Sequence, residues 1–279
     1  MISVLTNVTS LNAQRNLAST QAALATSVGR LSSGMRINSA SDDAAGLGIS
    51  ENLSANIKSL AQAQRNANDG ISMSQVAEGS MNDMQGIVSR MRELSVQSSN
   101  STLGGNERGY IQTEFTQLSS EINRISGVTN FNGQKLLDGS ASTGLTFQIG
   151  IQNTSNDRLS MSITKLTTST LGSTSLHIAS ASLSTATNAQ LAIGTFDKAI
   201  QQLSQARAKV GATQNRMTVT VSNLAVAQEN LTAANSRIRD VDVASESANL
   251  TKSQILSQAG IAVLSQANQI PQAALSLLR

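Results

Sequence analysis

Side chains able to carry out nucleophilic, acid–base or metal chemistry are scarce in this chain. His177 is the single histidine, and there is no cysteine. A metal centre needs several such ligands, and a catalytic base needs an orienting partner. We therefore interpret His177 as an ordinary polar residue.

Two other patterns could suggest a site, but each has a simpler structural explanation. Asp42 and Asp43 are adjacent, and adjacent residues of a helix point about 100° apart. This favours capping of a helix start over shared chemistry. Gly46 and Gly48 lack the preceding strand and the following lysine of a phosphate loop. The sequence therefore predicts no enzyme, no cofactor and no metal site.

The composition indicates long helices packed side by side. Of 279 residues only 2% are aromatic, and Pro271 is the single proline. Interior prolines break helices, and compact globules depend on aromatic rings. The net charge is +3 without a basic cluster, which argues against nucleic-acid binding. We find no apolar run of the ~20 residues that span a bilayer and no secretory signal pattern at the first residues.

Seven-residue spacing predicts the clearest helix. An apolar residue recurs at every seventh position from 196 to 238, which indicates a helix of roughly 45 residues. Apolar spacings of three and four predict helices over residues 43–99 and 105–126. Ser41 or Asp42 is the predicted N-cap of the first helix, and Gly70 makes a break within that helix plausible. The residues assigned to the bundle core are Ile111, Phe115, Leu118, Ile122, Phe196, Leu203, Val210, Met217, Leu224 and Leu231.

Between residues 140 and 170 the apolar period changes to two, which predicts a β-hairpin with one buried face. The alternating residues are Leu145, Phe147 and Ile149, then Leu159, Met161 and Ile163. The predicted fold class is mainly α, with long antiparallel helices in a coiled-coil bundle, a small β-hairpin, and the N- and C-termini paired.

The two ends of the chain are nearly free of charge. Residues 1–41 carry only Arg15, Arg30 and Arg36, and residues 253–278 carry no charge. Such amphipathic ends have little apolar surface with which to fold alone, so we expect them to order when buried against copies of themselves. The residues assigned to this inner-core assembly are Leu17, Leu24, Val28, Leu31, Leu250, Ile261, Leu264, Leu275 and Leu278.

Five segments in order match the motifs of one family. They read LSSGMRINSASDDAAG at 31–46, NANDGIS at 66–72, RMRELSVQSSN at 90–100, NFNGQKLL at 130–137 and QANQIPQ at 266–272. Together they resemble bacterial flagellin. The resemblance covers nearly the whole chain, except that the predicted hairpin leads almost directly into the last long helix, where many flagellins insert variable outer domains.

The resemblance implies a structural subunit that polymerises into the extracellular flagellar filament for swimming motility. Residues 1–43 with 236–279 would form the inner filament core, and residues 44–235 an outer helical domain. The implied partners are further copies, an export chaperone, the cap and hook-junction proteins, after unfolded export by the flagellar type III path. A hook-filament junction or coiled-coil adaptor protein stays open as the alternative. The zinc protease that some flagellins carry needs two histidines and is excluded.

The resemblance also implies a role for Arg90, Leu94 and Glu114. Matching residues of some flagellins bind a Toll-like innate receptor of the host, and the same surface serves axial contacts between subunits. Both roles stay open at this point. Leu118 replaces a basic residue that is common in strongly stimulatory flagellins.

Overall fold

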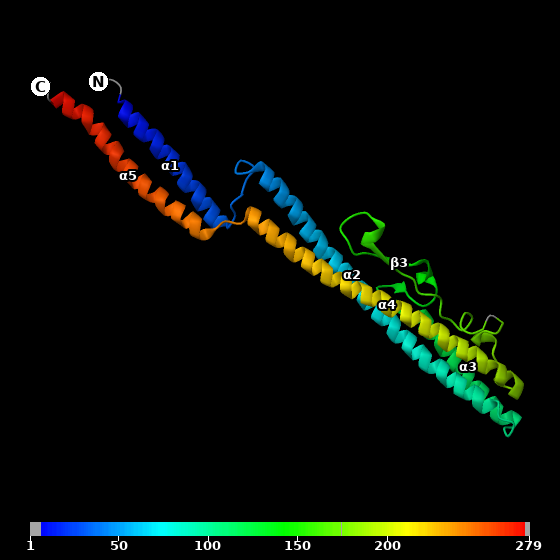
Figure 1. Ribbon diagram of the computed structural model, residues 1–279. Coiled ribbons are helices and arrows are strands. Elements are labelled where there is room, and N and C mark those ends of the chain that lie inside the picture. Colours follow the sequence, from blue (N-terminus) through cyan, green and yellow to red (C-terminus); the bar gives the residue numbers. More distant parts are fainter. Residues whose placement is uncertain (1–6, 174, 277–279) are drawn as a thin grey trace. The chain divides into compact units, whose positions relative to one another are not determined.

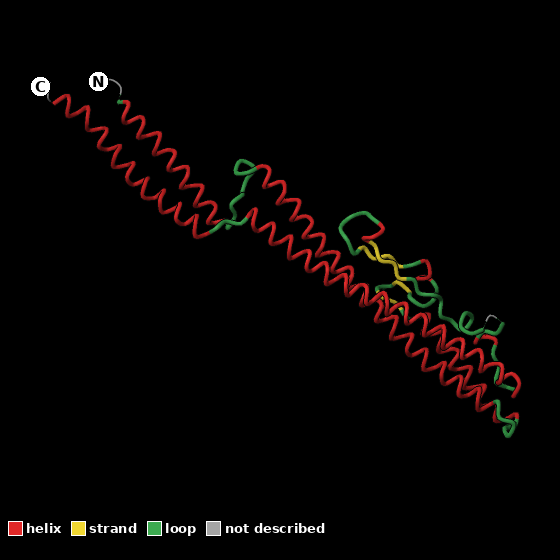
Figure 2. Tube along the Cα trace, viewed as in Figure 1, coloured by secondary structure: helices red, strands yellow, loops and turns green. Residues whose placement is uncertain are grey.

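The computed structural model describes residues 7–173 and 175–276, and side chains as far as residue 269 (Figures 1 and 2). The predicted fold class is confirmed, because long helices and two small antiparallel hairpins make up the described elements. No helix in this part is apolar over a length that could cross a bilayer. The helices are α1 (Val8–Ser33), α2 (Ala44–Ser98), α3 (Gly105–Val128), α4 (Ala186–Arg239) and α5 (Val243–Ser276).

The chain divides into two compact units. Residues 1–57 and 229–279 form the first, and residues 58–228 form the second. The predicted domains instead divide the chain at residues 43 and 236, near the start of α2 and the end of α4, and that division stays a prediction.

The second unit contains the large apolar core. Parts of α2 and α4 pack with α3, and the rings of Phe115 and Phe196 meet edge to face at 5.9 Å between centroids. Of the predicted bundle residues, Leu118 and Leu231 are half-buried. Those that the structure buries are Ile111, Phe115, Ile122, Phe196, Leu203, Val210, Met217 and Leu224.

The predicted hairpin forms from β3 (Leu145–Gln148) and β4 (Arg158–Met161), which are shorter than the alternating pattern. In its register Leu145 faces Met161 and Phe147 faces Leu159. A second hairpin, β1 (Asn130–Phe131) with β2 (Gln134–Lys135), turns through Asn132 and Gly133 at positive φ. The sequence analysis above does not predict this hairpin, although Asn-Gly is a strong signal for this turn.

An irregular strap, residues 162–185, covers the core of the second unit. It buries Leu166, Leu171, Ile178 and Leu183, and the helical structure among its described residues is one 3-10 turn, Ile178–Ser180. Amide side chains on the helices satisfy its backbone. Oε1 of Gln112 accepts from the N–H of Leu183 at 2.6 Å, and Gln202 both accepts from the N–H of Gly172 at 2.9 Å and donates to its carbonyl at 3.0 Å.

Two details of α2 differ from the prediction. Oδ1 of Asp43 accepts from the N–H of Gly46 at 2.8 Å, so Asp43 caps the helix in place of Ser41 or Asp42. The helix also runs through Gly70 without a break. A Cβ at this buried residue would lie 2.7 Å from Sδ of Met217, so the glycine provides room for a close side chain.

Candidate functional site: the helix pair of the two chain ends

The two ends of the chain meet as an antiparallel pair, α1 with α5 (Figure 1). Oγ of Ser10 donates to Oδ1 of Asn268 at 2.8 Å, and Arg30 faces Glu246 at the other end of the pair. We call the facing positions the α1–α5 seam. They recur every three and four residues, as in a coiled coil. The seam consists of Ser10, Ala13, Leu17, Thr20, Leu24, Ser27 and Leu31 on α1, with Glu246, Leu250, Ser253, Ser257, Gly260, Leu264 and Ala267 on α5.

Three of the predicted assembly leucines of α1 lie in this seam, but Val28 does not. Val28 is 50% exposed, whereas Ser27 is buried. The seam includes Ser27, three residues after Leu24, and not Val28, four residues after it. The seven-residue spacing of the leucines is compatible with either residue.

On α5, Leu250 and Leu264 lie half-buried in the seam, and Ile261 is 55% exposed. Gly260 takes the seam position beside it, because a Cβ there would lie 3.2 Å from Cδ1 of Leu17. Val28 and Ile261 therefore lie outside the seam that the leucines share, and the assembly role predicted for them stays a prediction. The side chains of Leu275 and Leu278 lie outside those that the structure describes.

The seam by itself buries little apolar surface. Its buried members are Ser10, Ser27, Glu246 and Ala267, and each of its leucines is only half-buried. The small members of the seam, Gly260 and Ser27 among them, are absent from the predicted set, although their seven-residue spacing is visible in the sequence. A seam of serine, alanine and glycine allows close helix approach but supplies little of the hydrophobic free energy that a core provides.

Large apolar side chains point away from the seam into solvent. We call these residues the outer apolar face; their exposed fractions run from 48% to 61%. The two helices carry only Arg15, Arg30, Glu246 and Lys252 as charges. Exposed apolar surface with so little charge is typical of a protein–protein contact. The outer apolar face consists of Val8, Leu11, Val28, Ile255, Leu256, Ile261 and Val263.

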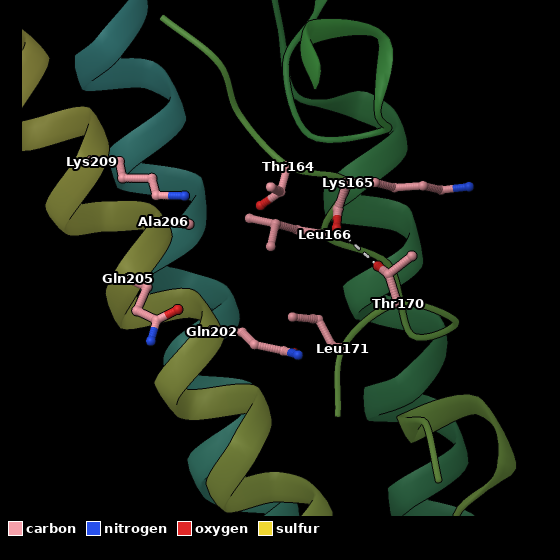
Figure 3. Close-up of a pocket in the computed structure, with 9 residues that line it drawn as sticks. All are labelled: Thr164, Lys165, Leu166, Thr170, Leu171, Gln202, Gln205, Ala206 and Lys209. Atoms are coloured by element: carbon pink, nitrogen blue, oxygen red, sulfur yellow. Dashed lines mark hydrogen bonds between the residues drawn. The ribbon is translucent and has the colours of Figure 1, made fainter. Parts of the chain in front are cut away.

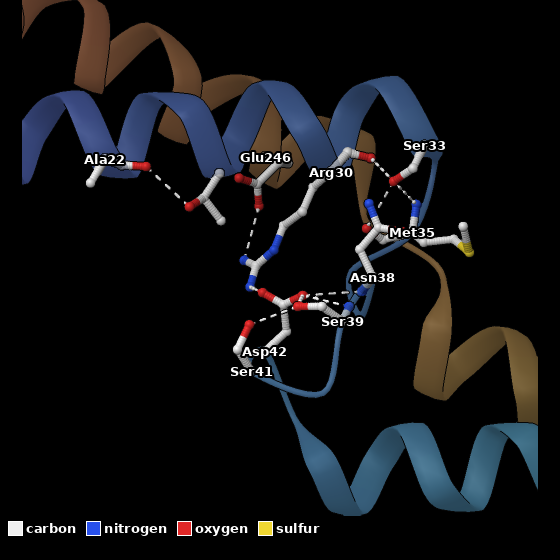
Figure 4. Close-up of polar contacts among 10 residues, drawn as sticks. Ala22, Arg30, Ser33, Met35, Asn38, Ser39, Ser41, Asp42 and Glu246 are labelled. Atoms are coloured by element: carbon white, nitrogen blue, oxygen red, sulfur yellow. Dashed lines mark hydrogen bonds and ion pairs between the residues drawn. The ribbon is translucent and has the colours of Figure 1, made fainter.

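A charged cluster closes one end of the pair (Figure 4). Guanidinium nitrogens of Arg30 lie 3.9 Å from a carboxylate oxygen of Asp42 and 3.9 Å from one of Glu246. Asp42 also accepts from the N–H of Ser39 at 2.9 Å and from that of Asn38 at 3.2 Å. The backbone hydrogen bond from Ser39 is the main cause that lowers the pKa of Asp42, so the carboxylate that faces Arg30 is the form that the folded loop favours.

Next to this cluster, backbone hydrogen bonds join the α1–α2 loop, residues 34–43, to the end of α4 and the α4–α5 loop, residues 239–242. The N–H of Arg36 donates to the carbonyl of Arg239 at 2.6 Å, and the N–H of Val241 donates to that of Gly34 at 3.1 Å. Gly34 has φ of 72° and ends α1 in the left-handed conformation, which glycine adopts without strain.

The predicted receptor or axial-contact residues lie in the second unit. Nε of Arg90 donates to Glu114 at 2.9 Å, and its Nη1 donates to Glu93 at 3.1 Å. The bond to Glu114 is the main cause that raises the pKa of Arg90. Leu94 is 1% exposed and packs in the core. Residues four apart differ by about 40° around a helix, enough here to turn Leu94 inward, so Leu94 does not share the exposed surface of Arg90 and Glu114.

The hollow under the strap offers no catalytic arrangement among its described residues. It has a volume of about 380 Å³ between the strap and α4. Figure 3 shows Lys209 and Gln202 reaching from α4 toward the strap, while Lys165 points away. Thr170 donates to the carbonyl of Lys165, and Gln202 is held by Gly172. These polar groups serve the strap's backbone.

Comparisons with known proteins agree with a subunit built around paired terminal helices. The bacterial flagellin N-terminal helical region matches residues 4–142, and the C-terminal helical region matches residues 193–278. Flagellin of Halalkalibacterium halodurans is 45% identical over 98% of both chains. The flagellar filament 33 kDa core protein of Treponema phagedenis is 42% identical, again over 98% of both.

A solved structure, a putative flagellar hook-associated protein from Vibrio parahaemolyticus, shares the fold. The TM-score is 0.61, over 71% of this chain and 100% of that one, at 14% identity. This likeness concerns the fold alone and does not favour the junction-protein alternative. Relatives of 42–45% identity over almost the entire length decide the question: the chain belongs to the bacterial flagellins, the structural subunits of the flagellar filament.

Proposed function

We propose that this filament subunit joins its neighbours through the outer apolar face of its α1–α5 pair. The observation that carries the proposal is the contrast between the seam inside the pair and the apolar side chains on its outer surface. Small and half-buried residues fill the seam, whereas Ile255 and Val8 are 61% and 60% exposed. Burying such side chains fully is worth about 1.5–3 kcal/mol each. Repeated head-to-tail contacts of this kind give a helical polymer.

We further propose that the pair becomes stably ordered as the polymer grows. The second unit contains a large apolar core that includes Phe196 and Met81, both fully buried. The pair has no large apolar side chain that is fully buried among its described residues. A helix pair without a core gains too little from burial to offset its conformational entropy. Neighbouring copies would supply the missing surface. On this basis residues 1–43 with 236–279 are assigned to the inner filament core, and residues 44–235 to the outer domain.

The remaining partners are proposed from family membership. A chain that leaves the cell unfolded through the flagellar type III path would meet an export chaperone and, outside, the cap and hook-junction proteins. The low charge of both ends fits this route, because an unassembled apolar face needs a chaperone to keep it from aggregating.

A Toll-like innate receptor is proposed for the surface of Arg90 and Glu114, which are both exposed and paired. The axial contact between subunits would use the same residues. A receptor reporter assay on monomer compares the native chain with Arg90→Ala, which should lower the signal. Equal signals from the two would leave the axial contact as the role of this surface.

The assembly proposal is tested by placing a charge on the outer apolar face. Val263→Glu and Leu256→Glu should each prevent filament growth, because a carboxylate buried at a contact loses its hydration without gaining a partner. Gln254→Glu is the matched control. It adds the same charge to an exposed polar position of α5, and no member of the outer apolar face lies three or four residues from it along the helix.

Filament growth from short seeds is measured by sedimentation and electron microscopy. The control should form filaments of normal length, and the two face variants should remain soluble. Circular dichroism of the soluble chains checks that the second unit is folded in all three. Normal growth of Val263→Glu and Leu256→Glu would rule out this face as the contact.

A further inference from the structure

The α1–α5 seam has few features that select one helix register over another. The seam leucines of α1, Leu17, Leu24 and Leu31, are spaced seven apart, so a slip of seven residues places leucine where leucine was. In the observed register Leu17 faces Gly260. After such a slip it would face Ala267 or Ser253, which are also small. Apolar packing in this seam therefore discriminates weakly between registers.

Polar contacts at the two ends of the seam do discriminate. At one end Nδ2 of Asn7 donates to the carbonyl of Ala267 at 2.7 Å, and Ser10 donates to Asn268. At the other end Arg30 lies between Glu246 and Asp42 (Figure 4). Glu246 is only 8% exposed. A slip of seven residues would separate it from Arg30 and leave a buried carboxylate without its cation, which is costly.

The contacts of Arg30 are better suited to fixing the register of α1 against α5 than to stabilising the helix pair. Both ion pairs are 3.9 Å long, and Nε of Arg30 is buried with no hydrogen-bond partner among the described atoms. A pair of this kind recovers little of the desolvation free energy of its charges. Polar groups in a coiled-coil seam are nevertheless known to fix register at some cost in stability.

We propose that Arg30 is the positioning residue that sets the register of α1 against α5 through Glu246, while Asp42 of the α1–α2 loop holds its guanidinium in place. The proposal rests on the proposed function in one respect. Register decides which residues of the two helices lie side by side, and so whether Val8 and Leu11 of α1 form one continuous outer apolar face with the C-terminal half of α5.

Because the chain has no cysteine, engineered disulfides can report the register directly. A Cβ built on Gly260 lies 3.8 Å from Cβ of Leu17, close to the mean for a disulfide, about 3.8 Å. Leu17→Cys with Gly260→Cys is therefore the in-register pair. Leu17→Cys with Ala267→Cys, or with Ser253→Cys, reports a slip of seven residues in either direction. In the native register these positions lie about 10 Å along the helix from Gly260.

Filaments of each double-cysteine chain are oxidised mildly, and closed monomers are quantified on non-reducing gels and by mass spectrometry. With native Arg30 the in-register pair should close and the other two should not. Arg30→Met should raise the ratio of slipped to in-register product about tenfold, which corresponds to ~1.4 kcal/mol between registers. Arg30→Lys keeps the charge and should restore the native ratio.

An unchanged ratio in Arg30→Met would overturn the proposal, and would assign the register to the backbone bridge of Arg36 and Arg239. Equal loss of all products would also overturn it, because a merely stabilising residue changes yield and not register. If Arg30→Met gives no filaments, the same pairs are measured in Glu246→Gln, which leaves Arg30 with Asp42. Failure here is separable from failure of the assembly proposal, which is tested with Arg30 intact.

Discussion

The division of labour between the two units can be tested with one substitution made in two places. Leu203 in α4 and Leu24 in α1 both lie at seven-residue repeat positions of helices. Leu203 is fully buried in the core of the second unit, whereas Leu24 is half-buried in the α1–α5 seam. Leu203→Ala and Leu24→Ala remove the same atoms, so any difference between them comes from the surroundings.

The expected magnitudes differ in the monomer and in the filament. Leu203→Ala should lower the free energy of unfolding of the monomer by ~3 kcal/mol, within a range of about 2–5. With a urea m-value of ~3 kcal/mol per M, the midpoint falls by ~1 M. Leu24→Ala should change that midpoint by less than ~0.2 M, because the seam adds little to the monomer. It should instead raise the critical concentration for growth roughly thirtyfold, the equivalent of ~2 kcal/mol.

Urea unfolding followed by circular dichroism measures the first quantity, and the protein left in the supernatant of seeded filaments measures the second. A matching loss of monomer stability in both variants would refute the reasoning, because the terminal pair would then be part of the same cooperative core.

Three further predictions concern two glycines and the effect of pH. Gly172→Ala should destabilise the second unit by more than ~1 kcal/mol in urea unfolding, because φ is 125° and the new Cβ would lie 2.8 Å from the carbonyl oxygen of Leu176. Gly194→Ala, inside α4 with open space around it, should stabilise it by ~0.5–1 kcal/mol. The pKa of Asp42 lies below its ordinary 3.8, so its contribution to filament stability is complete above that pH and is lost as the pH falls through the lowered pKa. Asp42→Asn should therefore flatten the acid dependence of filament melting below about pH 4; an unchanged acid profile would contradict this.

The long helices could be predicted from sequence because their apolar spacing is complete. Phe196, Leu203 and Val210 repeat without interruption, and the structure buries all three. The seam of the terminal pair was harder to predict. Because small residues occupy the facing positions, the three leucines define the seven-residue repeat but not its companion position. Their spacing therefore fits Val28 as well as Ser27, and the structure buries Ser27.

Other features depend on contacts between residues far apart in the chain. The strap is held by Gln112 and Gln202, whose amides bind a backbone with no local pattern of its own. Leu94 is buried because its side of α2 packs in the core of the second unit, and its spacing from Arg90 cannot reveal which side of the helix meets that core. Arg30 and Glu246 are 216 residues apart, and only the paired helices bring them together.

The central claim is that the α1–α5 pair becomes stably ordered with assembly. Hydrogen–deuterium exchange, resolved by residue, should be measured on dilute monomer and on filaments of the same chain. Amides of α1 and α5 should exchange rapidly in the monomer while those of α4 around Leu203 stay protected, and all of them should be protected in the filament. Strong protection of α1 and α5 in the dilute monomer, equal to that of α4, would contradict the claim.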